Sequence, residues 1–298
     1  MKVQEKKGAR ERRGAWHTDR RVRRDGGVAV TGEEVLTGGG VNHVVRAGDT
    51  VRRPAGPWTP AVHALLRHLR ERGFTGAPRA HGLDEQGREI LDFVPGETAD
   101  HPLPGWARAD GALTGVARLL RGYHDATAGF AAPPDAVWYF PPVEPAEVIC
   151  HGDVATYNCV FREGRPVAFI DFDTAHPGPR VWDVAYAAYR FAPLGDPGHA
   201  GARPVEEQAR RLRLFADAYG LGDDDRRALV PTARARLDHL VRHMRERAAA
   251  GDAAFAAHVA RGDDRLYSAD IAHLARHEPE LTGALTGALT CRSPRSDR

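Results

Sequence analysis

Apolar and polar residues alternate in short runs over the first hundred residues of the chain. A strand is expected within "VAVTGEEVLTGGG" (28–40), and further strands at "VNHVVR" (41–46) and "TVRRP" (50–54). The last two runs are separated by Gly48-Asp49, a pair that is typical of a hairpin turn. The first part of the folded body is therefore expected to consist of three antiparallel strands.

A helix is predicted next, over 57–73, because its apolar residues recur at helical spacing. Gly73 suits the position just past the end of that helix. The runs 79–83 and 88–94, separated by "DEQG", predict a second hairpin, and "VPGET" (94–98) marks a break. Residues 28–98 are thus expected to form a small lobe with the order β-β-β-α-β-β. The apolar positions of the helix are Val62, Leu65, Leu66 and Leu69.

After this break the pattern is mainly helical. Apolar residues three and four apart predict a helix over 109–127, and a short hairpin is expected from "NCVF" (158–161) and "VAFI" (167–170). The fold class is therefore α+β, with a small antiparallel lobe and a mainly helical lobe over 99–298. Further helices are predicted near 181–191, 203–220, 223–249 and 251–277.

The charge of the chain is unevenly distributed. Residues 1–27 hold ten Lys/Arg and four Asp/Glu, a surplus of six positive charges, whereas the whole chain carries +2. The remainder is therefore mildly acidic, at −4, which argues against a nucleic-acid-binding body. A basic, Gly-punctuated segment with few apolar residues is expected to be a disordered tail. Contact of this tail with a nucleic acid or an anionic surface is the alternative.

Composition is that of an ordinary globular protein, with 42% hydrophobic and 28% charged residues. No apolar run has the length of a membrane span, and residues 1–27 lack the apolar segment of a secretory signal, so a cytoplasmic protein is expected. The three cysteines cannot form a disulfide framework. Cys150 and Cys159 lie in apolar runs and are interpreted as buried hydrophobic residues, and Cys291 has no evident role.

Polar residues occur where two apolar runs end. "HGDVATYN" (151–158) follows Val148-Ile149-Cys150, and "VAFI" runs directly into Asp171. Magnesium ions prefer oxygen ligands, and one or two carboxylates plus substrate phosphates commonly hold them. Transfer of a γ-phosphoryl group also needs a carboxylate that orients the attacking hydroxyl. Asp153, Asn158 and Asp171 together supply such a set.

These motifs resemble the catalytic core of the aminoglycoside phosphotransferase family, whose members are small-molecule kinases with a protein-kinase-like two-lobe fold. The resemblance rests on "HGDVATYN" and on "VAFIDFDTAHPGPRVWDVA" (167–185) and extends over nearly the whole body of the chain. It implies that Asp153 is the catalytic base, and that Asn158 and Asp171 bind Mg²⁺. It further implies ATP as the phosphate donor.

The resemblance also assigns supporting roles in the helical lobe. His151 is expected to support the catalytic loop as a packed, hydrogen-bonded scaffold residue. Asp183 is expected to anchor that loop, since a carboxylate is favourable in the first turn of a helix. Asp173 is left open between an accessory metal contact and a loop contact. Trp182, Tyr186 and Tyr189 have helical spacing, for which core packing is favoured over substrate stacking.

The nucleotide site is expected in the small lobe. Gly38, Gly39 and Gly40 resemble the turn that covers the nucleotide, where glycine lets backbone amides approach phosphates. The family places a basic residue on the third strand, and adjacent strand residues face opposite sides, so only one of Arg52 and Arg53 lines the cleft. Arg52 is chosen because Val51-Arg52 matches the apolar-then-basic ending of that strand.

One feature of this predicted site departs from the family pattern, and another has two interpretations. The glutamate that usually pairs with the basic residue from the helix is absent from "PAVHALLRHL" (60–69). Either an acid comes from elsewhere in the fold, or the arginine has none. Asp92, Phe93 and Val94 resemble the hinge, where backbone groups contact a purine; a plain strand end is the other interpretation.

The primary hypothesis is an ATP- and Mg²⁺-dependent kinase that phosphorylates a hydroxyl of an aminoglycoside-like or other small alcohol substrate. A protein kinase is disfavoured because 171–183 is short for a regulated activation loop. A nucleotide-binding immunity or regulatory protein without turnover is the alternative. No nucleic acid or membrane partner is expected for the body, which is expected to be a monomer or weak homodimer. Whether late carboxylates converge on Asp153 is left open: Asp223, Asp224, Asp225, Asp263, Asp264 and Asp270.

Overall fold

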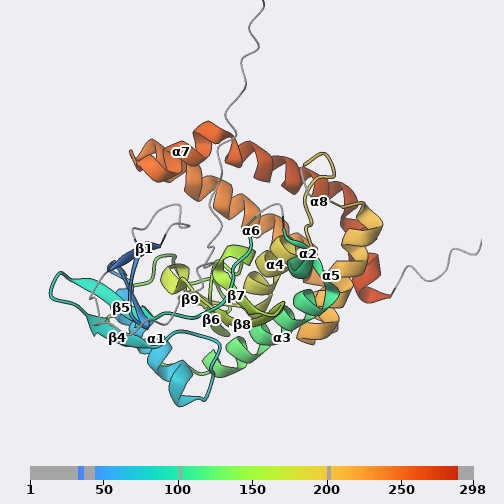
Figure 1. The fold of residues 1–298 in the computed structure, drawn as a ribbon. Helices are drawn as coiled ribbons and strands as arrows, with labels where there is room; N and C mark the ends of the chain where they lie inside the picture. The colour runs from blue at the N-terminus through green and yellow to red at the C-terminus, as the bar shows by residue number, and fades with distance from the viewer. Residues whose placement is uncertain (1–32, 37–43, 101–102, 200–202, 288–298) are drawn as a thin grey trace, which may run out of the picture.

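An antiparallel sheet of five strands with one helix beside it forms the first lobe of the computed structural model (Figure 1). The structure describes residues 33–36, 44–100, 103–199 and 203–287. The basic segment 1–27, the Gly38–Gly40 turn and Cys291 lie outside the described residues. The elements of this lobe are β1 (Glu34–Leu36), β2 (Val44–Ala47), β3 (Thr50–Pro54), α1 (Thr59–Glu71), β4 (Ala80–Leu83) and β5 (Arg88–Asp92).

The strand order in this sheet is β1-β2-β3-β5-β4, and every neighbouring pair is antiparallel. The predicted order of three strands, a helix and two strands is therefore confirmed. β3 and β5 pair in a register that places Arg52 opposite Ile90 and Arg53 opposite Glu89. Arg53 and Glu89 are both buried, so the central pair of strands carries an ionic pair on its inward face.

The chain segment between the lobes is fixed to the second lobe by a short β-bridge. Glu97 and Phe161 exchange two backbone hydrogen bonds, of 2.9 and 2.8 Å. Gly96 precedes this bridge at φ +148°, and a Cβ atom there would lie 2.5 Å from the carbonyl oxygen of Phe161. Only glycine allows this close approach, so the break predicted at "VPGET" is a specific crossing point between the lobes.

The second lobe is mainly helical and encloses two small β-pairs. β6 pairs with β9, and β7 pairs with β8, both antiparallel. The β7–β8 hairpin was predicted, whereas β9, the partner of β6, was not. The elements are α2 (Gly105–Arg108), α3 (Asp110–Thr127), β6 (Val148–Cys150), the 3₁₀ turn η1 (Thr156–Asn158), β7 (Cys159–Arg162), β8 (Arg165–Phe169), the 3₁₀ turn η2 (Phe172–Thr174), β9 (His176–Gly178), α4 (Arg180–Phe191), α5 (Val205–Tyr219), α6 (Asp223–Ala249), α7 (Ala253–Arg261) and α8 (Asp263–Thr286).

The segment 251–277 is helical, as predicted, but it is divided between two helices. The structure has two helices there, α7 and α8, separated by Gly262 in the left-handed conformation at φ +84°. Asp252 begins α7 by accepting hydrogen bonds from the backbone N–H groups of Ala254 and Phe255. A glycine that ends a helix in this conformation interrupts the helical hydrogen bonds, although the apolar spacing continues.

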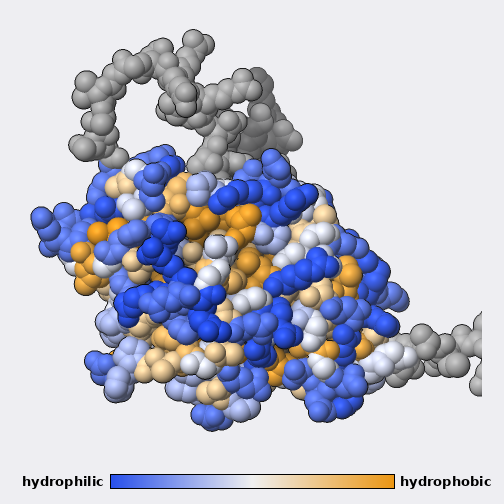
Figure 2. All heavy atoms as spheres, turned by 90° about the horizontal axis from the view of Figure 1, so that it is seen from below, coloured by the Kyte–Doolittle hydropathy of each residue, from blue (hydrophilic) through white to orange (hydrophobic). Residues whose placement is uncertain are grey.

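One continuous apolar core runs from α1 through α3 and α4 to α5, α6 and α8. Cys150 and Cys159 are free and fully buried within this part of the fold, as predicted. Hydrophilic residues predominate on the face shown in Figure 2, with apolar residues visible between them. Among the described residues, none of the helices combines the length and the apolar character that a membrane crossing requires.

Candidate active site

The loop between β6 and β7 carries the H-G-D sequence, and His151 fixes its conformation. Burial lowers the pKa of His151, so the ring is neutral near pH 7. Its Nε2 lies 3.1 Å from the carbonyl oxygen of Ile170, and its Nδ1 accepts a hydrogen bond of 3.3 Å from the backbone N–H of Asp153. The neutral ring therefore donates from Nε2 and accepts at Nδ1. The predicted scaffold role of His151 is confirmed.

Gly152 is required by the close packing of this loop against η2. Its φ is +82°, and a Cβ atom would lie 2.3 Å from the carbonyl oxygen of Thr174. The carbonyl oxygen of Gly152 accepts a hydrogen bond of 2.6 Å from the buried guanidinium of Arg236 on α6. The glycine of the motif is thus explained by sterics, and α6 holds the loop from its other side.

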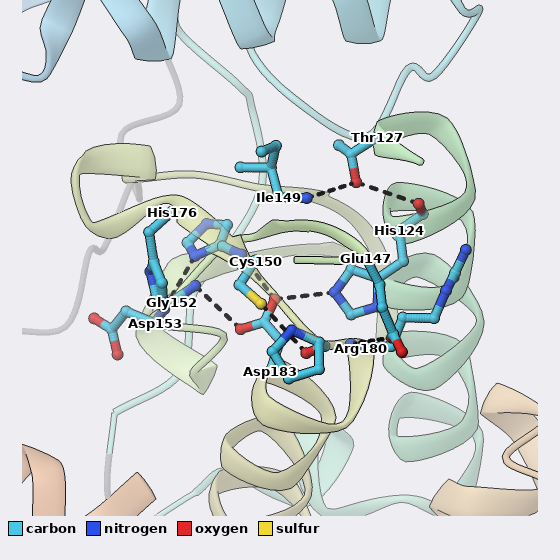
Figure 3. Close-up of polar contacts among 12 residues, drawn as sticks. His124, Thr127, Glu147, Ile149, Cys150, Gly152, Asp153, His176, Arg180 and Asp183 are labelled. Carbon is cyan, nitrogen blue, oxygen red and sulfur yellow. Dashed lines mark hydrogen bonds and ion pairs between the residues drawn. The ribbon is translucent and has the colours of Figure 1, made fainter. Parts of the chain in front are cut away.

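Asp183, in the first turn of α4, is the polar centre beneath the loop (Figure 3). Its carboxylate accepts from the backbone N–H groups of His151 and Gly152, at 2.7 and 3.1 Å, and lies 3.1 Å from Nε2 of His124. Burial raises its pKa, but the hydrogen bond and charge interaction with His124 and the interactions with His151 outweigh burial and bring it to about 2. The predicted anchoring role of Asp183 is confirmed.

Asp153 and Asn158 are in direct contact. The carboxamide nitrogen of Asn158 donates to the Asp153 carboxylate at 2.9 Å and to its backbone carbonyl at 3.1 Å. The hydroxyl of Tyr157 donates to the other carboxylate oxygen at 3.0 Å. Figure 3 shows that this carboxylate points away from Asp183. Burial and the nearby Asp171 raise the pKa of Asp153, while His151 and Arg190 act in the opposite direction.

Asp171 lies two residues after the end of β8 and follows Ile170, which contacts Asn158. The backbone N–H of Ile170 donates to the carbonyl oxygen of Asn158 at 2.9 Å, which brings the two predicted metal ligands side by side in the fold. Asp171 itself has a left-handed backbone, with φ +65° and ψ +68°. This conformation is costly for a residue with a Cβ atom and is found where the surroundings enforce it. The strand end is therefore shaped around the position of this carboxylate.

The basic residue that faces this cluster is Arg53, so the choice of Arg52 was wrong. Arg53 reaches Asp171 at 2.6 Å and Asp173 at 2.5 Å. Arg52 lies on the opposite side of β3, where its guanidinium contacts the hydroxyl of Thr50. Successive side chains of a strand alternate between its two faces, and the pairing of β3 with β5 decides which of the two points inward.

The acid missing from α1 is supplied by β5. Glu89, buried to 1% exposure, forms an ion pair with Nε of Arg53. Helix α1 contributes His63, whose Nε2 lies 3.0 Å from the other oxygen of Glu89. The sequence analysis did not identify Glu89. Glu89 and Leu91 lie two residues apart in "REILD" and so face the same side of a strand, which was a signal that could have identified this acid as inward-facing.

The ionic cluster at this point contains one guanidinium and three carboxylates: those of Glu89, Asp171 and Asp173. Burial and repulsion from Asp171 and Glu89 raise the pKa of Asp173, although the ion pair with Arg53 opposes this. One positive charge faces three negative ones here; Arg53, Glu89 and Asp173 are largely withdrawn from water, whereas the Asp171 carboxylate is 44% exposed. The cluster therefore has an excess of negative charge that a bound cation would balance.

The described residues contain no group of three or more His, Cys, Asp and Glu side chains arranged to hold a metal ion by themselves. The donors that are present are the carboxylate of Asp171 and the carboxamide oxygen of Asn158, whose nitrogen is committed to Asp153. Few protein ligands, all of them oxygen, are what Mg²⁺ uses when phosphates complete its shell. The residues fit a magnesium–phosphate complex better than a metal ion bound by protein alone.

The three predicted hinge contacts are not equivalent. The backbone N–H of Asp92 donates to the carbonyl of Arg79, and that of Phe93 to the carbonyl of Asp49. Both N–H groups are therefore used within the small lobe and are not available to a purine. In the described part of the chain, the N–H of Val94 has no such partner. The side chain of Asp92 lies 2.7 Å from Nε2 of His81.

Several of the late carboxylates have partners of their own. Asp270 accepts from the hydroxyl of Tyr189 at 2.6 Å and from the backbone N–H of Asp196 at 2.7 Å. Asp264 pairs with Arg245 at 2.9 Å. Asp223–Asp225 occupy the first turn of α6, where carboxylates are favourable. These acids stabilise helices and their connections, and no hydrogen bond joins any of them to Asp153 among the described residues.

A small antiparallel lobe joined to a helical lobe, with an Asp–Asn loop facing a strand-end Asp, defines the class of protein-kinase-like phosphotransferases. Residues 132–229 match the model of the phosphotransferase enzyme family. The chain is also 40% identical, over 207 residues, to the trifolitoxin immunity protein of Rhizobium leguminosarum bv. trifolii, covering 66% of this chain and 78% of that protein. The chain belongs to the phosphotransferase enzyme family.

Solved structures confirm the two-lobe α+β fold. A choline/ethanolamine kinase family protein from Mesorhizobium loti aligns with a TM-score of 0.60 at 16% identity, over 86% of this chain and 92% of that one. The GDP complex of aminoglycoside 2'-phosphotransferase-IIIa aligns with a TM-score of 0.57 at 16% identity, over 82% and 94%. Since both identities are low, these similarities concern the fold alone.

Proposed function

We propose that this protein is a small-molecule kinase that transfers the γ-phosphate of a Mg²⁺-bound nucleotide, ATP, to a hydroxyl group of an alcohol substrate. The observation that carries the proposal is the arrangement of Asp153, Asn158 and Asp171 at one place, facing Arg53 from the small lobe. Membership of the phosphotransferase enzyme family supports it. The nucleotide complex of the similar aminoglycoside 2'-phosphotransferase-IIIa supports a nucleotide as donor.

Each residue has a defined part in this reaction. The acceptor oxygen forms a bond to the γ-phosphorus, the bond from that phosphorus to the β–γ bridging oxygen breaks, and the nucleoside diphosphate leaves. Asp153 orients the hydroxyl and takes its proton, and its raised pKa brings the carboxylate closer to the range in which a base is effective. Asn158 holds Asp153 and, with Asp171, offers oxygen atoms to Mg²⁺, which neutralises phosphate charge when bound. Arg53 positions Asp171 and Asp173.

The test is phosphoryl transfer by the wild type and by Asp153→Asn, measured as ADP release with Mg·ATP and a panel of aminoglycosides, amino alcohols and sugars. Loss of a general base costs about 10²- to 10⁴-fold in rate. Binding of Mg·ATP, measured by thermal shift, should survive because Asp153 is not a nucleotide ligand in this proposal. Asp238→Asn, an exposed change on α6, is the matched control.

Equal loss of transfer and nucleotide binding in Asp153→Asn would contradict this division of roles. The panel should be run with GTP as well as ATP, because the solved complex contains GDP. Nucleotide binding by the wild type without turnover in the presence of any acceptor would contradict the kinase proposal itself.

A nucleotide-binding immunity protein without turnover is the second candidate, favoured by the 40% identity to the trifolitoxin immunity protein. A protein that only binds a nucleotide does not need Asp153, Asn158 and Asp171 together. The presence of all three therefore favours an enzyme with turnover. The two candidate functions predict different results for Asp153→Asn in a host exposed to trifolitoxin. Protection that requires catalysis is lost with Asp153→Asn, whereas protection by binding alone is kept.

A further inference from the structure

Arg190, near the end of α4, lies close to the proposed catalytic base. Its guanidinium carbon is 5.3 Å from the centroid of the Tyr157 ring, and the hydroxyl of Tyr157 donates to Asp153 at 3.0 Å. Arg190 also acts electrostatically on the carboxylate of Asp153. A single aromatic side chain therefore separates this cation from the proposed base.

The guanidinium of Arg190 has no polar partner within the described residues. It forms neither an ion pair nor a hydrogen bond there, and its Nε is buried without a partner. Its charged neighbours are Asp153 and the exposed Asp100, and neither pairs with it directly. Two fully buried arginines of the chain have partners: Arg211 pairs with Asp110, and Arg236 donates to Gly152. Arg190 is partly buried, and a nitrogen withdrawn from water without a polar partner is costly unless something else binds the guanidinium.

Several tyrosines interact electrostatically with this guanidinium. Tyr186 precedes it by one helical turn on α4, and Tyr267 comes from α8; Arg190 and Asp153 act electrostatically on both. Neutral rings exclude water and strengthen an ionic contact made among them. The interactions of Arg53, by contrast, are with Asp171, Asp173 and Glu89. Arg53 therefore binds carboxylates of the protein, whereas Arg190 has no such partner among the described residues.

We infer that Arg190, with Tyr157 and Tyr267, binds an anionic group of the phosphate acceptor. This inference rests on the proposed kinase function and narrows its substrate class. The acceptor is a hydroxyl compound that also carries a carboxylate or a phosphate ester. A polycation of the aminoglycoside kind would place an ammonium group against an uncompensated guanidinium, which repels it. Arg190 keeps its proton throughout, since the hydroxyl proton goes to Asp153.

The test uses four acceptors that share a three-carbon skeleton: glycerol, glycerate, glycerol 3-phosphate and 3-aminopropane-1,2-diol. Binding to the full-length wild type is measured by calorimetry in the presence of Mg·ADP, and phosphorylation is measured with Mg·ATP. Charge-assisted hydrogen bonds in such surroundings predict about 10- to 100-fold tighter binding of an anionic member than of glycerol. Glycerate and glycerol 3-phosphate distinguish the two anionic groups.

The variants are Arg190→Met, which keeps the length of the side chain without its charge, and Arg190→Lys, which keeps the charge. Arg190→Met should abolish the preference for the anionic members by raising their KM, and Arg190→Lys should restore part of it. Nucleotide binding should remain within about twofold in both. Arg242→Met is the matched control, because Arg242 is an exposed arginine of α6 that pairs with Asp238.

The outcomes separate this inference from the proposed function. Anion binding that depends on Arg190, without any phosphorylation, keeps the inference and contradicts the kinase function. Phosphorylation of the four compounds with equal efficiency in the wild type and in Arg190→Met overturns the inference and keeps the kinase function. An Arg190→Met variant that loses acceptor-independent ATP hydrolysis also overturns it, because Arg190 then acts on the transferred phosphate. If Arg190→Met does not fold, the comparison of the four acceptors with the wild type still tests the inference.

Discussion

Truncation of Asp183 to alanine should be among the most destabilising single changes in this chain. The carboxylate is fully buried and is the acceptor for the backbone N–H groups of His151 and Gly152 and a partner of His124. Removing it leaves buried donors without an acceptor. The loss of one member of a buried charged network costs about 3 to 5 kcal/mol. This is a large share of the 5 to 15 kcal/mol that stabilises a typical domain.

The measurement is urea unfolding followed by tryptophan fluorescence, with Asp238→Ala as the control. Asp238 is an exposed carboxylate of α6 in an ion pair with Arg242, and its removal should cost less than about 1 kcal/mol. A difference below about 1 kcal/mol between Asp183→Ala and the wild type would refute the idea that Asp183 holds the catalytic loop.

The pKa of Asp183 gives a second, independent test of the same interaction. Its folded pKa of about 2 lies below its ordinary value of 3.8, so the ionised form is favoured in the folded state. The stabilisation is fully present above pH 4 and is lost as the pH falls towards 2, which amounts to about 2 kcal/mol. The stability difference between the wild type and Asp183→Asn should therefore shrink over this window. A difference that stays constant from pH 5 to pH 2 would contradict the assignment.

Three further predictions concern the residues around the site. Arg53→Met should destabilise the protein by about 3 to 5 kcal/mol in urea unfolding, because three carboxylates lose their common partner, whereas Arg52→Met should change stability by less than about 0.5 kcal/mol; similar effects of the two would contradict the placement of Arg53. Gly152→Ala should cost more than Gly129→Ala in the same assay, since both have positive φ but only Gly152 would bring a Cβ against a carbonyl oxygen; equal costs would show that the close contact does not matter. Mg²⁺ should raise the thermal stability of the ATP-bound wild type more than that of Asp171→Asn, and an equal rise in both would exclude Asp171 as a ligand.

Local sequence determined the polar loop and its neighbours to a large extent. His151, Gly152 and Asp153 are consecutive, and Asn158 follows within the same short loop, so their contacts depend on few residues. The lobes and their order also followed from the spacing of apolar residues, which records the face that each element buries. The spacing of apolar residues did not predict the helix break at Gly262, because this spacing continues across the glycine. The helical hydrogen bonds, by contrast, are interrupted there.

Only the tertiary structure decided which arginine faces the site and which acid accompanies it. Arg52 and Arg53 are adjacent arginines, and local sequence favoured Arg52; the register between β3 and β5 instead places Arg53 opposite Glu89. The position of Arg190 beside Tyr157 likewise depends on how α4 packs against the catalytic loop. The sequence by itself determined the chemistry of the loop, because neighbouring residues form it. Long-range pairing selected the cations around that loop, because charges distant in the chain meet only after strands and helices have packed.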